Sequence, residues 1–440
     1  MRHVTRRTVL GWGAGLAGAS LGSRIFATRA HAQGMAQGPF KPEPGANLRL
    51  LRWSGFVKSD EEVWNAHTKK FTDQTGVGVA VEYITWEDVR PKAALAANLG
   101  SGPDIVMGWY DDPHIYPNSL VDVSDVAEGL GKRLGGWYDV ARTYGYSEAQ
   151  KRWIAVPIGS PIGCLNYRVS WMKEAGFDTF PDDLDGFMRL AKGLKARNHP
   201  IGFPLGRAVG DGNVWTHWLL WSFGGKAVEA DTKTIAINQQ PTWDALEYAK
   251  ELYEQFAPGA GSWLDPNNNR AFLAGEISVT NNGISIYYAA KKDFPQIAED
   301  MNHAAFPKGR SGRHTELHLF TQAFIFKHSA YPNAAKAYID FMLDAPQANP
   351  WVEAMNGYVT PALKSFKNNP VWTRDPKATP FRDGLDRALH NGYAGAPGQK
   401  AAAALAEFIV VDMFADATAN RMSAKDAARR AETRLRRIYR

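Results

Sequence analysis

The chain is 440 residues long, and its 51 lysine and arginine residues outnumber its 45 aspartate and glutamate residues. Five of the arginines and none of the acids lie within residues 1–33, so the remaining 407 residues carry 46 basic and 45 acidic side chains. This near-neutral balance excludes the strongly basic class of proteins that binds nucleic acid or acidic membranes through net charge, and the length favours two lobes over one large core.

The first 33 residues follow the order of regions found in an export signal. Arg6 and Arg7 precede a weakly apolar run over residues 9–21, which four glycines dilute. Ala30-His31-Ala32 then supplies the small-x-small pattern of a cleavage site. A glycine-diluted run behind twin arginines is typical of the Tat export route. An ordinary basic tail is the alternative, but the ordered regions favour a mature protein that begins near Gln33 and works in the bacterial periplasm.

Cys164 is the only cysteine, so the chain cannot form an internal disulfide even in an oxidising compartment. No cysteine lies beside the predicted cleavage site, which excludes the lipid-modified cysteine that anchors many exported proteins. Residues 401–419 look apolar, but Glu407, Asp412 and Asp416 interrupt them, as in an amphipathic helix. We therefore expect a soluble mature protein.

Residues 34–46 are rich in glycine and proline, and we expect a disordered leader there. After it, strand and helix patterns alternate, which predicts a parallel sheet with helices on both faces. Ser59 and Glu62 form a capping-box pattern, and Gly76 and Gly100 end the two predicted helices. The predicted elements are a strand over 48–53, a helix from Ser59 to near Gly76, a strand over 77–83, a helix over 88–99 and a strand over 104–107.

Each of these three strands is followed by a loop that pairs an aromatic ring with a polar group. Ligands of such sheets bind beyond the carboxyl ends of the strands, where these loops meet. Sugars need that pairing, because their C–H faces stack on rings while their hydroxyls bond to carboxylates, amides and lysines. A packing role is commoner for any single tryptophan, but three in equivalent positions favour a ligand site. The candidates are Trp53, Lys58, Trp86, Glu87, Trp109, Tyr110 and Asp111.

A second α/β region follows residues 153–157. It contains an aspartate-capped helix from Asp182, a polar helix start over 210–215 and a strand with its loop over 277–283. Residues 319–326 are predicted to form a strand and residues 333–343 a helix.

Eight short segments occur in the order found in a known family. They are Thr75-Gly76-Val77, residues 102–106, residues 120–123, residues 155–157, residues 166–168, residues 174–177, Asn281-Asn282-Gly283 and Gly357-Tyr358. On these segments the chain resembles the family 1 extracellular solute-binding proteins, the maltose-binding-like components of carbohydrate ABC importers. The resemblance spans residues 47–363. The Tat-type signal and the missing lipid-attachment cysteine depart from the family pattern, and both concern export and anchoring rather than the fold.

The resemblance implies an α/β, two-lobed periplasmic-binding-protein fold of the type II, clamp-like class, with a ligand cleft between the lobes and a helical C-terminal tail. Lobe 1 would contain residues 47–158 and 314–358, and lobe 2 residues 159–313 and 359–440. Family members bind a sugar or polyol in the cleft and deliver it to ABC transporter permease subunits at the inner membrane. We therefore expect a monomer with no catalytic residue, no metal, no cofactor and no nucleic acid partner.

The resemblance also implies ligand contacts by position. In lobe 2 and at the return to lobe 1 these contacts are Asp211, Asn213, Trp215, Asn282, Gly283 and Tyr358. Trp218 and Trp221 follow Trp215 at helical spacing, which favours packing in the core. We expect Trp109→Ala or Trp215→Ala to weaken binding by about 1–3 kcal/mol, the usual scale for an aromatic anchor. A mono-, di- or oligosaccharide, a polyol and a glycerol phosphate all stay open as ligands, and Lys58 would suit an anionic sugar.

An exported enzyme is the rival class of function. The sequence has no zinc-protease helix, no Cys-x-x-Cys, no Gly-x-Ser-x-Gly elbow and no phosphate loop. His314 and His318 alternate as metal ligands could, although surface histidines are commoner. The acidic pairs at 87–88 and 111–112 could serve a glycosidase, but such pairs more often accept hydroxyl hydrogen bonds. A sensor that signals to a membrane receptor would use the same clamp, so the sequence leaves that alternative open.

Overall fold

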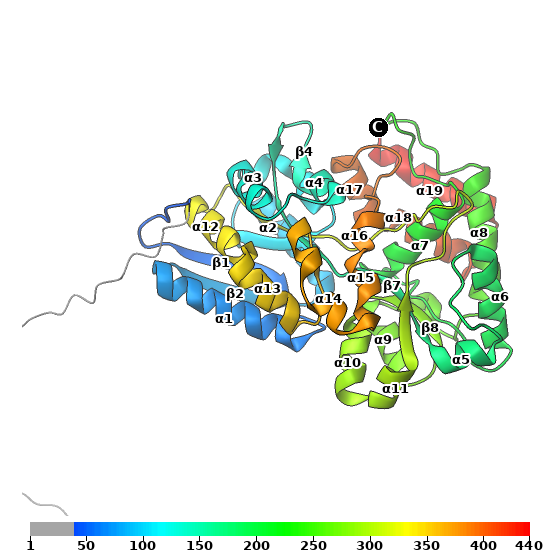
Figure 1. The fold of residues 1–440 in the computed structure, drawn as a ribbon. Helices are drawn as coiled ribbons and strands as arrows, with labels where there is room; N and C mark the ends of the chain where they lie inside the picture. The colour runs from blue at the N-terminus through cyan, green and yellow to red at the C-terminus, as the bar shows by residue number, and fades with distance from the viewer. Residues whose placement is uncertain (1–38) are drawn as a thin grey trace, which may run out of the picture. The chain divides into compact units, whose positions relative to one another are not determined.

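The computed structural model describes residues 39–440, which form one compact unit (Figure 1). The predicted export signal and its cleavage site lie outside the described residues. Within the described part of the chain, no helix is both long and apolar enough to cross a membrane.

Two main sheets organise the fold. The six-stranded sheet has the order β11-β6-β10-β3-β1-β2 and the three-stranded sheet the order β8-β7-β9, while β4 and β5 form a small hairpin. The strands of the first sheet are β1 (Asn47–Trp53), β2 (Gly78–Ile84), β3 (Ile105–Trp109), β6 (Val156–Ser160), β10 (Thr321–Ile325) and β11 (Thr360–Pro361). The others are β4 (Tyr146–Ser147), β5 (Arg152–Trp153), β7 (Cys164–Arg168), β8 (Val279–Asn282) and β9 (Met301–Ala304).

The predicted alternation of strands and helices is confirmed in the first sheet. Strand β1 pairs in parallel with β2 and with β3, and the connecting helices end at Gly76 and Gly100, which adopt left-handed φ values of 74° and 63°. The helices that contact this sheet or cover it are α1 (Lys58–Thr75), α2 (Val89–Leu99), α3 (Ser124–Arg133), α4 (Asp139–Gly145), α12 (Pro332–Leu343) and α13 (Ala345–Ala354).

The sheet is mixed rather than purely parallel. Strand β10 runs antiparallel to both β3 and β6, and β11 runs antiparallel to β6. The local pattern of residues 48–107 correctly indicated the parallel part. It carried no information about β10, which returns to this sheet after the chain has built the second one.

The predicted capping box does not form. Helix α1 begins at Lys58, and the Ser59 hydroxyl donates to the Ala354 carbonyl oxygen of α13 at 2.6 Å. Because the N-cap of α1 is Val57, Ser59 lies inside the helix, and its hydroxyl bonds to α13 instead of accepting a first-turn N–H. Likewise, the helix predicted from Asp182 is α6, whose cap is Asp183, which accepts from the Gly186 N–H at 2.7 Å.

The end of the predicted leader is fixed by a contact with a helix. The Glu43 carboxylate accepts the backbone N–H groups of Asn333 and Ala334, both at 2.9 Å. These are free N–H groups of the first turn of α12, which attract a carboxylate. The structure therefore differs from the expected disorder in the described part of the leader, residues 39–46.

Helices pack around the three-stranded sheet and extend beyond it. Those between β7 and β9 are α5 (Val169–Glu174), α6 (Leu184–Lys195), α7 (Asp211–Ser222), α8 (Gln240–Tyr253), α9 (Asp265–Leu273), α10 (Ser285–Asp293) and α11 (Pro295–Asp300). The C-terminal helices are α14 (Val371–Arg374), α15 (Thr379–Arg382), α16 (Gly384–Arg387), α17 (Gln399–Ala406), α18 (Ile409–Ala417) and α19 (Ala424–Ile438). Helices α18 and α19 pack on α7 and α8, at the same side of the molecule in Figure 1. The apolar stretch over 401–419, which the sequence suggested as one amphipathic helix, is divided between α17 and α18.

The chain passes between the two main sheets three times. It leaves β6 for β7 through residues 161–163, returns from β9 to β10 through residues 305–320, and leaves again after β11 for the C-terminal helices. The buried apolar side chains of both parts form one continuous core. These crossings bring loops that are far apart in the sequence to a single place.

Candidate functional site

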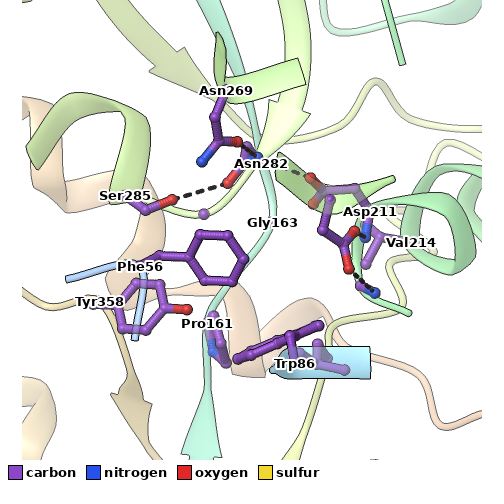
Figure 2. Close-up of a pocket in the computed structure, with 14 residues that line it drawn as sticks. Phe56, Trp86, Pro161, Gly163, Asp211, Val214, Asn269, Asn282, Ser285 and Tyr358 are labelled. Carbon is purple, nitrogen blue, oxygen red and sulfur yellow. Dashed lines mark hydrogen bonds between the residues drawn. The ribbon is translucent and has the colours of Figure 1, made fainter. Parts of the chain in front are cut away.

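A pocket with an enclosed volume of about 40 Å³ is lined by residues from both main parts of the fold. Loops that follow strands of the first sheet, the crossing segments and helix ends of the second region all contribute to its wall (Figure 2). The lining residues are Phe56, Trp86, Pro161, Gly163, Gly210, Asp211, Val214, Asp265, Asn269, Asn282, Gly283, Ser285, Leu319 and Tyr358.

Three aromatic rings form one wall of the pocket. Trp86 lies in a short 3-10 turn, η1 (Trp86–Asp88), directly after β2, and its ring meets Phe56 edge-on with centroids 5.4 Å apart. Trp86 also packs on Trp109 at 4.2 Å. In Figure 2 the rings of Phe56, Tyr358 and Trp86 lie on the same side of the pocket. Such rings offer flat faces for the C–H groups of a ligand.

Two carboxylates at helix starts form the facing wall. Asp211 is the first residue of α7 and Asp265 is the first residue of α9. Asp265 accepts the backbone N–H groups of Gly210 at 2.9 Å and Asp211 at 2.7 Å, so it binds the exposed N–H groups at the start of α7. These N–H groups need an acceptor, which accounts for the aspartate at position 265.

Side-chain amides fix the orientation of Asp211. One carboxylate oxygen of Asp211 accepts from Asn268 and from Asn282, both at 2.8 Å. Asn282 also bonds to Asn269, and its side-chain oxygen accepts the Ser285 hydroxyl at 3.1 Å. Figure 2 shows this row of polar groups opposite the rings. The arrangement presents acceptors and amides in fixed positions, as the recognition of hydroxyl groups requires.

Burial and mutual repulsion change the acidity of this wall. Burial, and then the nearby charge of Asp265, hold the pKa of Asp211 well above its usual range. Burial raises the pKa of Asp265 to about 6, although the two backbone N–H groups oppose the shift. Neither carboxylate forms an ion pair with any lysine, arginine or histidine of residues 39–440. The pocket is therefore an acidic site rich in hydrogen-bond acceptors.

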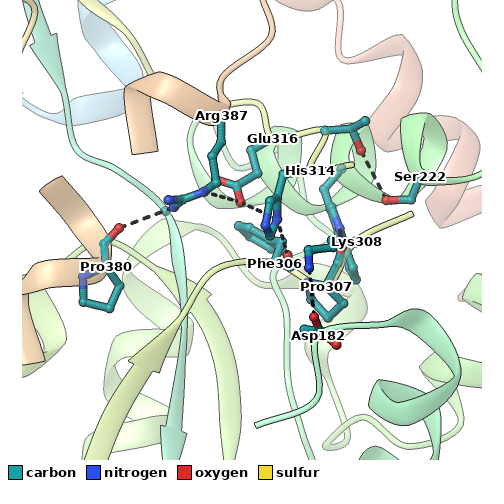
Figure 3. A network of polar contacts seen from close by, with 12 residues as sticks. Asp182, Ser222, Phe306, Pro307, Lys308, His314, Glu316, Pro380 and Arg387 are labelled. Carbon is teal, nitrogen blue, oxygen red and sulfur yellow. Dashed lines mark hydrogen bonds and ion pairs between the residues drawn. The ribbon is translucent and has the colours of Figure 1, made fainter. Parts of the chain in front are cut away.

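A second polar network lies on the return crossing, near the pocket (Figure 3). The buried Glu316 carboxylate accepts from Arg387 at 2.9 Å and lies 2.9 Å from Nε2 of His318, and His314 is 3.5 Å away. His318 Nδ1 accepts the Gly163 N–H of the first crossing at 3.3 Å. No group of acidic, histidine or cysteine side chains in the described part of the chain could hold a metal. His314 and His318, which the sequence offered as possible metal ligands, instead lie beside the Glu316–Arg387 ion pair, and His318 bonds to the first crossing segment.

Five of the thirteen predicted site residues line the pocket together. They are Trp86, Asp211, Asn282, Gly283 and Tyr358. Trp86 came from its position after a strand, and the other four from the family resemblance. They arrive from both sheets and from the return at residue 358, as a cleft between lobes requires.

Three predicted tryptophans are fully buried and do not line the pocket. Trp53 and Trp109 pack against each other at 5.1 Å, and both pack against Trp86. Trp215 donates to the Pro204 carbonyl oxygen at 2.7 Å and packs against Phe203. Trp53 and Trp109 therefore pack against the pocket residue Trp86 and do not line the pocket themselves, contrary to the predicted ligand contact. Trp215 packs in the core. Trp218 lies in the core, as predicted.

The remaining predicted residues have other partners. The Lys58 side chain is 82% exposed and faces Glu62 at 3.5 Å, so it does not point into the pocket. Tyr110 donates to Val209 O at 3.2 Å, and Asn213 donates to the same carbonyl at 3.1 Å. The Asp111 carboxylate accepts from Asn391 at 2.7 Å. Glu87 stays partly exposed beside Trp86, outside the lining.

Sequence analysis missed several lining residues. Asp265 begins the segment Asp265-Pro266-Asn267, which is typical of a helix start and carries no signal of a ligand site. Phe56 lies within the first aromatic loop, from which only Trp53 and Lys58 were predicted as ligand contacts. The others that were missed are Pro161, Gly163, Gly210, Val214, Asn269, Ser285 and Leu319. Pro161, Gly163 and Leu319 lie on crossing segments, for which a local pattern gives no signal.

The sequence matches the model of a protein family described as bacterial extracellular solute-binding protein, over residues 66–380. A comparison with curated proteins finds no match.

The fold is similar to several solved structures. Maltose-bound MalE3 of T. maritima has a TM-score of 0.77 and 19% identity, over 89% of this chain and 100% of that one. A sugar transporter from Arthrobacter chlorophenolicus A6 with bound laminaribiose has a TM-score of 0.77 and 17% identity, over 90% and 99%. The GacH receptor of Streptomyces glaucescens, solved unliganded and with acarbose, has a TM-score of 0.75 and 17% identity, over 90% and 99%. These likenesses confirm the expected α/β periplasmic-binding-protein fold with C-terminal helices.

Proposed function

The chain belongs to the bacterial extracellular solute-binding protein family, and we propose that it captures a sugar or polyol for a carbohydrate ABC importer. The observation that carries this proposal is the composition of the pocket. Rings from the first sheet face carboxylates and amides from the second region across one small space. Membership of a family of binding proteins also supports a non-catalytic role.

The proposed mechanism is ligand capture by closure of two lobes. Lobe 1 would hold residues 47–158 and 314–358, and lobe 2 residues 159–313 and 359–440. Trp86 and Tyr358 of lobe 1 would stack on the C–H faces of a sugar, while Asp211 and Asn282 of lobe 2 bond to its hydroxyl groups. A ligand that contacts both lobes stabilises the closed form by its additional contacts there.

The same proposal includes partners and a place of action. The closed, ligand-bound protein would dock on permease subunits at the inner membrane and release its ligand to them. We propose that it works as a monomer in the periplasm after Tat export. Replacing Arg6 and Arg7 by lysine should then retain the precursor in the cytoplasm, as measured by cell fractionation and immunoblotting. Undiminished export of that variant would contradict the Tat route.

A thermal-shift screen tests the binding function. The protein of residues 33–440 would be melted with neutral sugars, polyols, amino sugars, sugar acids and glycerol phosphates. A ligand present at one hundred times its dissociation constant stabilises the folded state by about 2.7 kcal/mol, which gives a clear rise in Tm. A saturable shift with one carbohydrate class, without turnover of the compound, would support the proposal. No shift with any carbohydrate would contradict it.

A further inference from the structure

We propose that the ligand of this pocket carries a positive charge, as a protonated amino sugar or amino polyol does, and that its ammonium group sits between the Asp211 and Asp265 carboxylates and the aromatic wall. This inference rests on the proposed function, because it concerns the same pocket and narrows the class of carbohydrate.

The first argument is the absence of a protein cation from the site. None of the residues that line the pocket is lysine, arginine or histidine. Elsewhere in the described residues, the buried carboxylates Asp60, Asp112 and Glu316 each pair with an arginine at 2.6–2.9 Å, whereas buried Asp111 bonds to Asn391 and has no basic partner. Ionising two neighbouring buried carboxyl groups without such a partner costs free energy, which a cationic ligand between them would offset.

The second argument is the aromatic wall. No lysine or arginine of residues 39–440 lies over the rings of Phe56, Trp86 or Tyr358, whereas Arg52 is stacked at 4.5 Å from the centroid of Trp53. The faces of tryptophan and tyrosine attract ammonium groups within about 6 Å, more strongly when water is excluded. Trp86 is almost fully buried, and Trp109 packs against its ring at 4.2 Å, so only part of the ring faces the pocket. The wall therefore offers the ligand ring surface that no lysine or arginine of residues 39–440 covers.

The third argument concerns the rest of the ligand. Asn269, Asn282 and Ser285 form a neutral polar strip beside the carboxylates. Neutral amide and hydroxyl side chains both donate and accept hydrogen bonds, so they can bind the hydroxyl groups of a charged or an uncharged sugar. The enclosed volume of the pocket is about 40 Å³, so the walls must move apart to admit a ligand larger than a few atoms. A small polyhydroxylated amine has both the charge and the hydroxyl groups that these walls complement.

Binding of a cation would be coupled to proton release. Asp211 faces Asp265 of α9, and Glu87 of η1 adds further negative charge near Asp265. Tyr110 and Tyr358 also face these carboxylates, and burial keeps both phenols neutral because it raises their pKa values. An ammonium group would lower the pKa of both carboxyl groups, so the complex should release protons at neutral pH. Affinity should therefore increase as pH rises from about 5 to 7.

Calorimetric titration of the protein of residues 33–440 tests this inference. The probes are glucosamine, galactosamine and mannosamine, each compared with its parent hexose and its N-acetyl derivative, which lacks the charge. Titration in two buffers of different ionisation enthalpy measures the protons released. We expect at least one amine to bind ten times more tightly than both of its neutral counterparts and to release protons.

Matched variants separate charge from shape. Asp211→Asn keeps the size of the side chain and one acceptor oxygen, and it should remove the preference for the amine together with the proton release. Asp185→Asn makes the same change of charge at an exposed position of α6 and should leave both unchanged. If Asp211→Asn does not fold, as judged by circular dichroism, Trp86→Leu tests the aromatic wall in the same titrations.

The outcomes distinguish this inference from the proposed function. Equal or tighter binding of the neutral hexoses, or of a sugar acid, would overturn the inference while supporting carbohydrate binding. Binding by no amine and no neutral sugar would overturn both. An equal loss of affinity for charged and neutral probes in Asp211→Asn would assign Asp211 a purely structural role.

Discussion

At the scale of single residues, burial divides the tryptophans into ligand contacts and core. Trp86 lines the pocket, whereas Trp215 is fully buried among Phe203, Phe256 and Phe414. Both side chains carry the same chemistry, and both belong to segments that sequence patterns associated with ligand. Their surroundings therefore decide what each contributes.

Alanine substitutions should separate these two roles. We expect Trp86→Ala to weaken ligand binding by about 1–3 kcal/mol, because its ring lines the pocket, and also to lower stability, because the ring is buried against Trp53 and Trp109. Trp215→Ala should instead destabilise the fold by about 3–5 kcal/mol, the usual effect of emptying a large core site. Urea unfolding and calorimetric titration measure the two quantities. Trp171→Ala, which removes a ring stacked on His199 outside the pocket, serves as the control for binding.

Asp211 makes the unliganded protein sensitive to pH. Its pKa in the folded state is raised mainly by burial, so the folded chain keeps this proton to a higher pH than the unfolded chain does. Asp265, with its pKa raised to about 6, acts in the same direction. Stability from these groups is therefore present near pH 4 and decreases as pH rises toward neutrality.

We expect Asp211→Asn to stabilise the unliganded protein at pH 7.5 by about 1–3 kcal/mol, because one pKa unit corresponds to about 1.4 kcal/mol. The gain should shrink as pH falls and disappear near pH 3, below the unfolded-state pKa of about 3.9, where the wild-type carboxyl group is protonated in both states. Urea titrations at pH 7.5 and at the acidic pH measure the free energy of unfolding of the variant and of the wild type. A variant that is less stable than wild type at pH 7.5 would show that the carboxylate stabilises the empty pocket.

At the scale of elements, the segment that leads into β10 is held by a buried ion pair. Glu316 lies on the return crossing and Arg387 ends α16, and Leu389 also donates its N–H to the Glu316 carbonyl oxygen at 2.8 Å. Burial acts to raise the pKa of Glu316, but the bonds from His318 and Arg387 outweigh it and hold the pKa below its usual range. The pair thus ties the C-terminal helices to the crossing.

We expect Glu316→Gln to cost about 3–5 kcal/mol at pH 7, because it leaves Arg387 buried without its carboxylate. Since the folded-state pKa of Glu316 is lowered, its contribution is complete above pH 4.5 and is lost as pH falls below that value. The difference between variant and wild type should therefore narrow in acid. Glu148→Gln, which breaks an exposed pair with Lys151, should leave the unfolding midpoint unchanged.

At the scale of the whole molecule, one side chain that follows β3 contacts the segment before α7. Tyr110 follows β3, and its hydroxyl donates to the Val209 carbonyl oxygen just before α7. This bond joins the two proposed lobes without lining the pocket. It can therefore favour the closed arrangement while making no contact with ligand.

We expect Tyr110→Phe to weaken ligand binding about fivefold, because one lost hydrogen bond of about 1 kcal/mol lowers the population of the closed form. Small-angle scattering should show a smaller radius of gyration for the wild type when the ligand from the thermal-shift screen is added. The variant should reach the same compact state at higher ligand concentration. An unchanged radius in the wild type would contradict capture by closure.

Local patterns predicted much of the fold but only part of the site. The strands and helices of residues 47–109 appear within a few residues of their predicted ends, since apolar periodicity and the glycines at 76 and 100 act locally. The lobe boundaries and the export route stay predictions. Of the site, the sequence indicated Trp86 and Asp211, but it gave equal weight to Trp53 and Trp215, which the fold buries.

By itself, the sequence determined the α/β class, the order of the elements and the family, because these depend on patterns that neighbouring residues carry. Only the tertiary structure decided which polar groups share the pocket. Asp211, Asp265 and Trp86 are far apart in the chain and meet because the chain crosses three times between the sheets. The tertiary structure also decided that no lysine, arginine or histidine of residues 39–440 pairs with the two carboxylates, and the charge of the ligand that we propose follows from this arrangement.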